Sequence, residues 1–355
     1  MKTIHFLILF SFLLGSVSCN SKLSYENSSL LQWDDFSHFS ELQSKNLKFR
    51  EPLLRPTRVY CINNTLIFKD DSEDNILHQY DSKTLQKKGS FFTFGSGPDE
   101  FLWIHHCQPL DTNIWISDLQ KRSINQYDIK MINKMDSNNI KAIKRIQFED
   151  HFSSITVLPN GHFMATINNP KHKRITLFDE NGNFIKTAGE FPPFQKELTP
   201  FESIEGFYCS IVLSPYKNFI YLFYKQTDLI EQYDLEGNLI KRIHGPEHFF
   251  PEVKEASKND MTHVSSIPEK SKDAYFCPVV TNDKMYVLYS GAYFDPKQPT
   301  YLMKHLFVFN NDGTPIQRYL LDQSIFCFAV NEETNKLYGI SNDPEFHIVE
   351  YSLKF

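Results

Sequence analysis

The chain has 355 residues, a formal net charge of −6 and 41% hydrophobic residues, which is an ordinary composition for a globular protein with a sizeable core. The mild acidity, without a dense Lys/Arg cluster, excludes the basic surface that nucleic acids or anionic membranes require. Aromatic residues are abundant at 15%, mainly through 32 Phe, and this favours strands over helices.

The N-terminus is predicted to be a targeting segment. Lys2 precedes an apolar run over residues 4–14, which is too short to span a bilayer and is typical of a signal-peptide core. Small residues then lead to Cys19, and the sequence "GSVSC" resembles a bacterial lipobox, although Ser16 stands where Leu is usual. The pattern predicts export from the cytoplasm.

We expect a signal peptide over residues 1–18 and lipidation of Cys19, which would make the protein an outer-membrane lipoprotein of the cell envelope. Simple cleavage after Ser18 is the alternative, because the small residues before it also permit that reaction. Residues 19–44 are then expected to be a polar tether. Whether the protein faces the periplasm or the cell surface stays open.

A short phrase recurs along the rest of the chain, as in "IEQYDLEGNLIKRI". Alternation of side chains predicts a strand, and the Asp-x-x-Gly spacing of Asp234 and Gly237 predicts an Asx turn into a second strand. Five further copies occur, with spacings of 42 to 76 residues between aromatic anchors. The anchors are Tyr80, Tyr127, Phe178, Tyr233, Phe309 and Tyr351.

Two more predicted strands precede each anchor, which gives four strands per copy. Repeats of about 40–50 residues with several strands each are typical of propeller blades. The sequence therefore predicts an all-β protein, a six-bladed β-propeller of four antiparallel strands per blade over residues 45–355. The last copy lacks a fourth strand, and we expect the N-terminal segment 45–54 to supply it and close the ring.

Cysteines occur in the predicted first strands of five blades, and the sequence aligns them at one common place. They are Cys61, Cys107, Cys209, Cys277 and Cys327, with Ser154 in the remaining blade. Small buried residues at a crowded radius explain this pattern, and a thiol ring for metal or redox chemistry is the alternative. We expect no disulfides, because neighbouring inner strands should lie too far apart.

Long connections are all predicted on one face of the ring, and the turns between first and second strands on the other. Loops of that size in a compact fold are commonly functional. The long loops carry aromatic residues, and the candidate binding residues among them are Phe249, Phe250, Tyr293 and Phe294. The alternative is that these rings pack within their own loops.

The stretch "FGSGPDEF" resembles the signature of the TolB-like six-bladed propeller lipoproteins of Bacteroidetes-type bacteria, and of NHL-like blades. The matching residues are Gly95, Gly97, Pro98, Glu100 and Phe101, and "HGPEHFF" is a weaker second copy. The resemblance implies an exported, lipid-anchored propeller, and the family supplies no catalytic residues. Glu100 is expected to accept backbone N–H bonds, or alternatively to bind a ligand at the channel mouth.

Motifs of hydrolases are lacking, so the sequence predicts no catalytic residues, no metal ligands and no cofactor. We expect a non-catalytic binding or scaffold protein whose partner is an envelope protein, a peptide or a glycan. The alternative is a metal-dependent hydrolase, lactonase or lyase at the channel mouth that uses Glu100, His105 or His106. Adjacent strand residues point to opposite sides, so the two histidines cannot share one ion. A purely structural assembly subunit is a third possibility.

Overall fold

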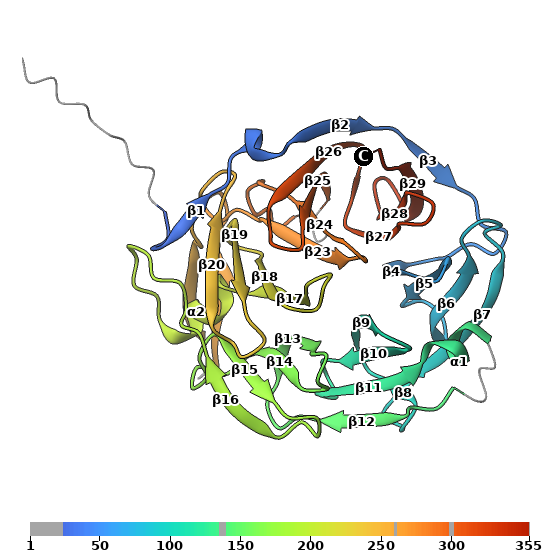
Figure 1. Ribbon diagram of the computed structural model, residues 1–355, viewed down its shortest axis with the longest axis horizontal. Helices are drawn as coiled ribbons and strands as arrows, with labels where there is room; N and C mark the ends of the chain where they lie inside the picture. The colour runs from blue at the N-terminus through green and yellow to red at the C-terminus, as the bar shows by residue number, and fades with distance from the viewer. Residues whose placement is uncertain (1–23, 135–139, 259–260, 298–301, 355) are drawn as a thin grey trace, which may run out of the picture.

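The computed structural model describes residues 24–134, 140–258, 261–297 and 302–354, and Cys19 lies outside these ranges. Six sheets of four or five strands stand around a central channel (Figure 1). This arrangement confirms the predicted six-bladed β-propeller. Within the described ranges, no helix is long and apolar enough to cross a membrane.

Each blade contributes its first strand to the channel wall and its fourth strand to the outer rim (Figure 1). Blade 1 contains β4 (Pro56–Ile62), β5 (Thr65–Asp70), β6 (Asn75–Asp81) and β7 (Lys87–Phe94). Blade 2 contains β9 (Ile104–Leu110), β10 (Asn113–Asp118), β11 (Ser123–Asp128) and β12 (Lys144–Gln147). Blade 3 contains β13 (Phe152–Val157), β14 (Phe163–Ile167), β15 (Ile175–Phe178) and β16 (Phe184–Ala188). Blade 4 contains β17 (Cys209–Leu213), β18 (Ile220–Tyr224), β19 (Leu229–Tyr233) and β20 (Leu239–His244). Blade 5 contains β23 (Tyr275–Val280), β24 (Lys284–Tyr289), β25 (Met303–Asn310) and β26 (Pro315–Ile325). Blade 6 contains β27 (Cys327–Asn331), β28 (Lys336–Ser341), β29 (His347–Ser352) and β3 (Ser44–Leu47).

The outer hairpins are closed by side-chain oxygens, as the repeated Asp-x-x-Gly spacing predicts. In blade 4, Asp234 Oδ1 accepts the backbone N–H of Asn238 at 2.8 Å, and Gly237 has a φ of 87°, which a side chain would strain. Asp179 and Asn310 repeat this geometry in blades 3 and 5. The turn chemistry thus sets the register of the strands that follow.

The aromatic anchors form the cores between blades. Each anchor pairs with the second strand of its own blade and is at most 4% exposed. Apolar clusters run from one blade to the next, and Phe163 of blade 3 and Tyr233 of blade 4 belong to the same cluster. Burial of such large side chains stabilises each interface by about 1.5–3 kcal/mol per residue.

The ring is closed as predicted, because β3 pairs antiparallel with β29 and completes blade 6. The pairing joins Leu47 to Ile348 and Ser44 to Tyr351. The same N-terminal segment then enters blade 1, so the two ends of the ring are held by one continuous stretch of chain. Pairing with β3 covers the outer edge of β29, which would otherwise be unpaired.

The expected polar tether over residues 19–44 is wrong for its described part. β1 (Ser28–Leu30) pairs parallel with the outer strand β20, and β2 (His38–Leu42) pairs parallel with β26. A short 3-10 helix, η1 (Trp33–Asp35), lies between them. We call residues 24–42 the N-terminal strap, since it runs around the rim of blades 4 and 5 (Figure 1).

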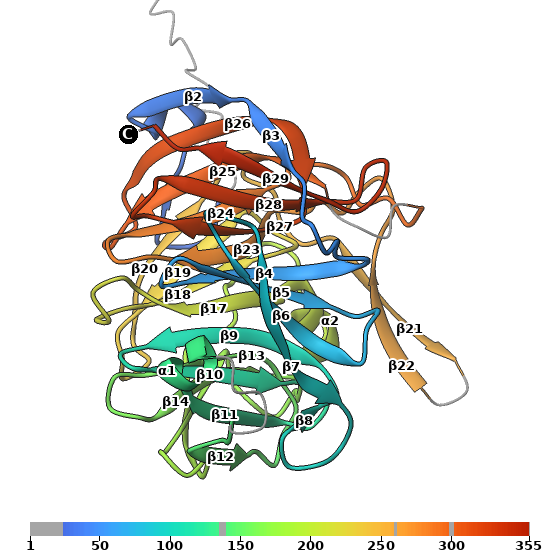
Figure 2. The ribbon, with the colours of Figure 1, turned by 90° about the vertical axis from the view of Figure 1, so that its right-hand side faces the viewer.

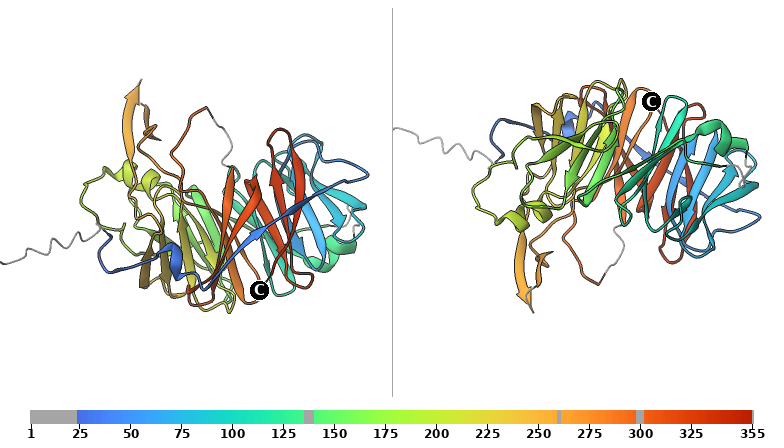
Figure 3. Two further views of the ribbon diagram at one scale, coloured as in Figure 1. Left: turned by 90° about the horizontal axis from the view of Figure 1, so that it is seen from above. Right: turned by 90° about the horizontal axis from the view of Figure 1, so that it is seen from below.

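The two faces of the ring differ in what they carry. One face holds α2 (Pro200–Gly206) and a hairpin of β21 (Val253–Lys258) and β22 (Met261–Ser266) that extends away from the disc (Figures 2 and 3). This hairpin belongs to the long connection between blades 4 and 5. We call this the long-loop face; the turns between first and second strands form the opposite, short-turn face. A brief β8 (Glu100–Phe101) and α1 (Ile129–Lys134) complete the elements.

Candidate functional site

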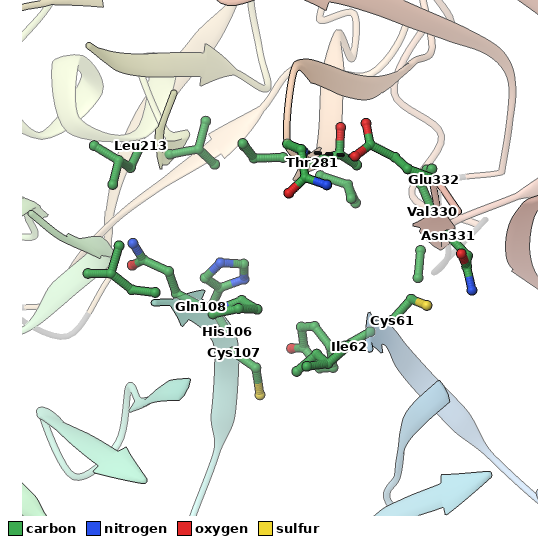
Figure 4. A pocket seen from close by; sticks show the side chains of 18 of the residues that line it. Cys61, Ile62, His106, Cys107, Gln108, Leu213, Thr281, Val330, Asn331 and Glu332 are labelled. Atoms are coloured by element: carbon green, nitrogen blue, oxygen red, sulfur yellow. Dashed lines mark hydrogen bonds between the residues drawn. The ribbon is translucent and has the colours of Figure 1, made fainter. Parts of the chain in front are cut away.

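A cavity of about 680 Å³ lies in the channel, and we call it the central funnel (Figure 4). Its volume is in the range that small-molecule sites occupy. It opens on the short-turn face, because the turns between first and second strands supply its rim. The rim residues include Asn63, Asn64, Asp111, Lys217, Asn282, Glu332 and Glu333. Sequence analysis placed the binding surface on the opposite, long-loop face.

The walls of the central funnel are largely apolar. Strand pairing allows the first strands to be compared. In each blade, one residue of the second strand pairs with the aromatic anchor, and we call the first-strand residue on its other side the wall residue. In five blades this wall residue lines the funnel. These residues are Cys61, Pro109, Leu213, Val280 and Val330. A ligand that enters from the short-turn face therefore meets mostly apolar side chains below a polar rim.

The predicted ring of cysteines is wrong in register. Cys61 holds the wall position, whereas Cys107 lies two residues before Pro109, the wall residue of its strand. Cys277 and Cys327 each lie three residues before their wall residues, and β23 contains a bulge at that point. The sulfur atoms therefore lie at different depths. The described cysteines are free thiols.

Arg58 on β4 forms part of the funnel floor. Asn63 at the rim follows it by five residues, a depth of roughly 16 Å along an extended strand. The guanidinium interacts electrostatically with Tyr60, Cys277 and Cys327, so it reaches towards blades 5 and 6. Its Nη1 donates to the carbonyl of Thr57 at 3.1 Å. Among the described residues, no carboxylate lies within ion-pair distance of it.

His106 also lines the central funnel, and its ring points into the opening (Figure 4). Burial, together with the positive charge of Arg58, lowers the pKa of His106 to about 4. The neighbouring His105 does not line the funnel, and burial, Arg58 and His106 lower its pKa well below the usual value. Both imidazoles are therefore neutral at pH 7.

A second cation lies beyond the floor. The Lys225 ammonium stands over the ring of Tyr208 at 4.4 Å and that of Phe276 at 5.5 Å. Burial and the nearby Arg58 lower the pKa of Lys225 to about 8. A hydrogen bond from Cys327, with Arg58 and Lys225 nearby, lowers the pKa of the Cys277 thiol to about 6. Two basic side chains, Arg58 and Lys225, thus lie beside a thiol of lowered pKa in the narrow part of the channel.

The buried carboxyl of Asp273, near Lys225, predicts that the stability of the protein depends on pH. Burial raises the pKa of its carboxyl to about 7, and Lys225 offsets this in part. Between pH 4 and 7 the folded protein retains a proton that the unfolded chain releases, so the stability contributed by this group falls as pH rises. We expect Asp273→Asn to raise the free energy of unfolding above the wild-type value by more than about 1 kcal/mol at pH 8. Urea titrations should show that the gain disappears near pH 4; an equal gain at both pH values would contradict the assignment.

The predicted aromatic residues of the long-loop face divide into packed and exposed rings. Phe250 stacks on Phe194 with centroids 5.3 Å apart, and Tyr25 of the N-terminal strap lies 4.7 Å from it. Phe249 is half-buried and packs against the core between blades 4 and 5. Both rings thus pack within the protein, but their partners lie in other segments rather than in their own loop.

Tyr293 is different, since 58% of its surface is exposed, while Phe294 is half-buried. The Lys272 ammonium lies 5.0 Å from the Tyr293 ring and 5.8 Å from that of Phe249. Lys272 also pairs with the Glu247 carboxylate at 2.5 Å. None of these residues lines the central funnel, so the long-loop face and the funnel are separate surfaces.

Glu100 serves the turn between blades 1 and 2. Its Oε2 accepts the backbone N–H of Gly97 at 2.7 Å, and a Cβ on Gly95 would lie 2.1 Å from the same oxygen. The Lys121 ammonium binds the carbonyls of Gly97 and Glu100 from the other side. The two glycines of the "GSGPDEF" motif thus let a carboxylate fold against the backbone, as the structural interpretation expects.

Across the four described ranges, no group of three or more His, Cys, Asp and Glu side chains is arranged to hold a metal ion.

Sequence reasoning did not single out Arg58 or Lys225. The available signal was a charged residue within the first strand "TRVYCI", where apolar and small residues are expected.

Comparisons with known proteins bear on the fold. No curated protein sequence matches. Among solved structures, a DUF4221-family protein from Bacteroides vulgatus is 12% identical with a TM-score of 0.57, and the match covers 89% of this chain and 96% of that one. A protein from Bacteroides fragilis is 11% identical with a TM-score of 0.54, over 92% of this chain and 100% of its own. The model of the TolB-like 6-blade propeller-like family matches residues 35–333. The chain therefore belongs to the TolB-like six-bladed propeller family.

Proposed function

We propose that the protein is an exported, lipid-anchored binding protein of the cell envelope that holds its ligand in the central funnel without transforming it. The observation that carries this proposal is the cavity of about 680 Å³ with apolar walls and a polar rim. Its floor offers a guanidinium without a carboxylate partner and a neutral imidazole. These groups suit recognition, because they orient a polar end while the walls bury the rest.

A scaffold role on the long-loop face stays a prediction. There Tyr293 is exposed and the β21–β22 hairpin stands clear of the disc, so an envelope protein, peptide or glycan has room to bind. The rings of Phe249 and Phe250 already have partners within the protein. The central funnel is the better supported site, since it combines concave shape, apolar walls and an unpaired charge.

Occupation of the central funnel is tested with N-phenyl-1-naphthylamine, an uncharged apolar dye that fluoresces when water is excluded. We expect the wild type to bind one dye molecule and Val280→Trp, which fills the wall, to lose binding at least tenfold. The matched control is Val264→Trp on β22, outside the funnel, and it should bind as the wild type does. Equal dye binding by the two variants would overturn the proposed site.

Export and anchoring are tested separately through Cys19. In a bacterial host that processes lipoproteins, we expect the wild type to take up an alkyne-labelled fatty acid and to sediment with membranes. Cys19→Ser should take up no label and should appear in the soluble fraction. A wild-type chain that starts at Cys19 but carries no label would instead favour simple cleavage after Ser18.

A further inference from the structure

The guanidinium of Arg58 has unused hydrogen-bonding capacity at the floor of the central funnel. An arginine side chain offers five N–H donors in a planar fork. One of them meets the carbonyl of Thr57. The other residues that interact with this charge are Tyr60, Cys277, Cys327 and Tyr208. None of them is a carboxylate, and the Cys277 thiol donates to the carbonyl of Phe326 at 3.2 Å. The fork is therefore left for a group from outside the chain.

The acidic residues of the central funnel lie at its rim and already have partners. Asp111 pairs with the Lys217 ammonium at 2.5 Å. Glu333 accepts the Asn64 amide at 2.5 Å, and a carboxylate oxygen of Glu332 accepts the backbone N–H of Asn282 at 2.9 Å. They stand about five residues, roughly 16 Å, above the floor. Because Lys130 and Lys217 also lie at the rim, the charges there largely cancel, and Arg58 at the floor is the charge that would orient a ligand with its anionic end inwards.

We propose that the central funnel binds an extended, largely apolar molecule by a terminal carboxylate that pairs with Arg58. This inference rests on the proposed function, since it names the ligand class of the same site. A depth of roughly 16 Å accommodates four to five extended peptide residues or a medium-length acyl chain. The chemistry shared by these sources is one carboxylate on an apolar stem, and the planar carboxylate matches the guanidinium fork.

The walls agree with this class of ligand. Pro109, Leu213, Val280 and Val330 surround the space above the floor and offer few hydrogen bonds to a polar body. The amide of Gln108 is engaged with the backbone of Val157 on the neighbouring blade. A stem that buries apolar surface therefore gains free energy along the walls, while the carboxylate gains its partner at the floor.

The test uses two pairs of probes with the full mature protein and isothermal titration calorimetry. One pair is N-acetyl-tetra-alanine with a free carboxylate and the same peptide as its C-terminal amide. The other pair is octanoate and octanamide. We expect the acid of at least one pair to bind and its amide to bind about 10- to 100-fold more weakly, as loss of a charged hydrogen-bond partner predicts. The pair that shows this contrast identifies the source.

Variants at Arg58 complete the test. We expect Arg58→Gln to bind the acid about 10- to 100-fold more weakly and to lose the contrast between acid and amide. Arg58→Lys should lie between it and the wild type, because it keeps the charge and loses the fork. The matched control is Arg55→Gln, an exposed arginine three residues away, which should behave as the wild type does.

Binding of N-phenyl-1-naphthylamine separates the possible failures. If Arg58→Gln still binds this uncharged dye, the funnel is intact, and the loss of acid binding supports the inference. If dye binding maps to the funnel but acids and amides bind equally, or neither binds, the carboxylate inference is overturned while the binding site stands. If the dye itself does not bind in the funnel, the proposed function fails.

Discussion

A chain that begins at residue 52 should lose the single cooperative unfolding transition that a chain beginning at residue 44 retains. Both lack the N-terminal strap, and they differ in the segment that contains β3. Without β3, the outer edge of β29 is unpaired and blade 6 has three strands. The same segment carries Phe49, which packs against Phe68 and Tyr80 of blade 1 with centroids 5.6 and 4.9 Å apart. Its loss removes a segment that ties the last blade to the first and leaves the apolar cluster between these two blades as their remaining contact.

The size of this effect should exceed that of any single substitution. Truncation of one buried Phe costs about 3–5 kcal/mol, and here the backbone pairing and Leu47 are lost as well. Circular dichroism and calorimetry on the two chains measure the difference, and a chain from residue 1 shows the separate contribution of the strap. If the chains that begin at residues 44 and 52 melt at the same temperature, β3 is not what closes the ring.

The blades were predictable because their signals are local. An anchor such as Tyr233, followed four residues later by Gly237, predicts a strand, a turn and a second strand from one short segment of sequence. Those signals do not depend on distant contacts, since the Asp234 carboxylate binds N–H groups two and four residues ahead. The closing strand followed from counting strands, because a ring with one missing member needs another segment to fill it.

The N-terminal strap was missed because its pattern is not that of a buried strand. Tyr25, Leu31 and Phe36 are buried, but they are spaced six and five residues apart, so neither the strand period nor the helix period is visible. β1 and β2 are held instead by backbone bonds to the outer edges of β20 and β26. Such pairing requires an exposed strand edge that exists only in the folded ring. The sequence of the N-terminal strap alone therefore does not predict it.

The central funnel was missed for a different reason. Loop length pointed to the long-loop face, but a cavity depends on how side chains from six strands converge, which chain order does not reveal. The predicted equal alignment of the cysteines failed because strand pairing puts Cys107 two residues and Cys327 three residues before the wall position in an unbroken register, and a bulge intervenes only next to Cys277. Arg58 was a usable signal that the sequence-based prediction left out, because it is a permanent charge in a strand that was expected to line the channel.

The largest effect of a single substitution is expected at Glu231, which lies within the repeated phrase itself. Its carboxylate is fully buried and accepts the Arg242 Nε–H at 2.7 Å, the Tyr224 hydroxyl at 2.5 Å and the Tyr233 hydroxyl at 2.8 Å. Arg174 in turn donates to the Tyr224 hydroxyl at 2.7 Å. The network therefore links the outer strands of blade 4 to blade 3 through one carboxylate.

Glu231→Ala should lower the free energy of unfolding by about 3–5 kcal/mol, because it leaves the buried Arg242 guanidinium without its counter-charge and two hydroxyls without an acceptor. Glu236→Ala, an exposed position in the same repeat, should change it by less than about 0.5 kcal/mol. Urea titrations of both variants measure these values. Replacing Glu231 and Arg242 together by Leu should recover much of the loss, since the cost of one unpaired charge then disappears. If the double replacement is as unstable as Glu231→Ala, the loss comes from the two hydroxyls without an acceptor rather than from the orphaned guanidinium.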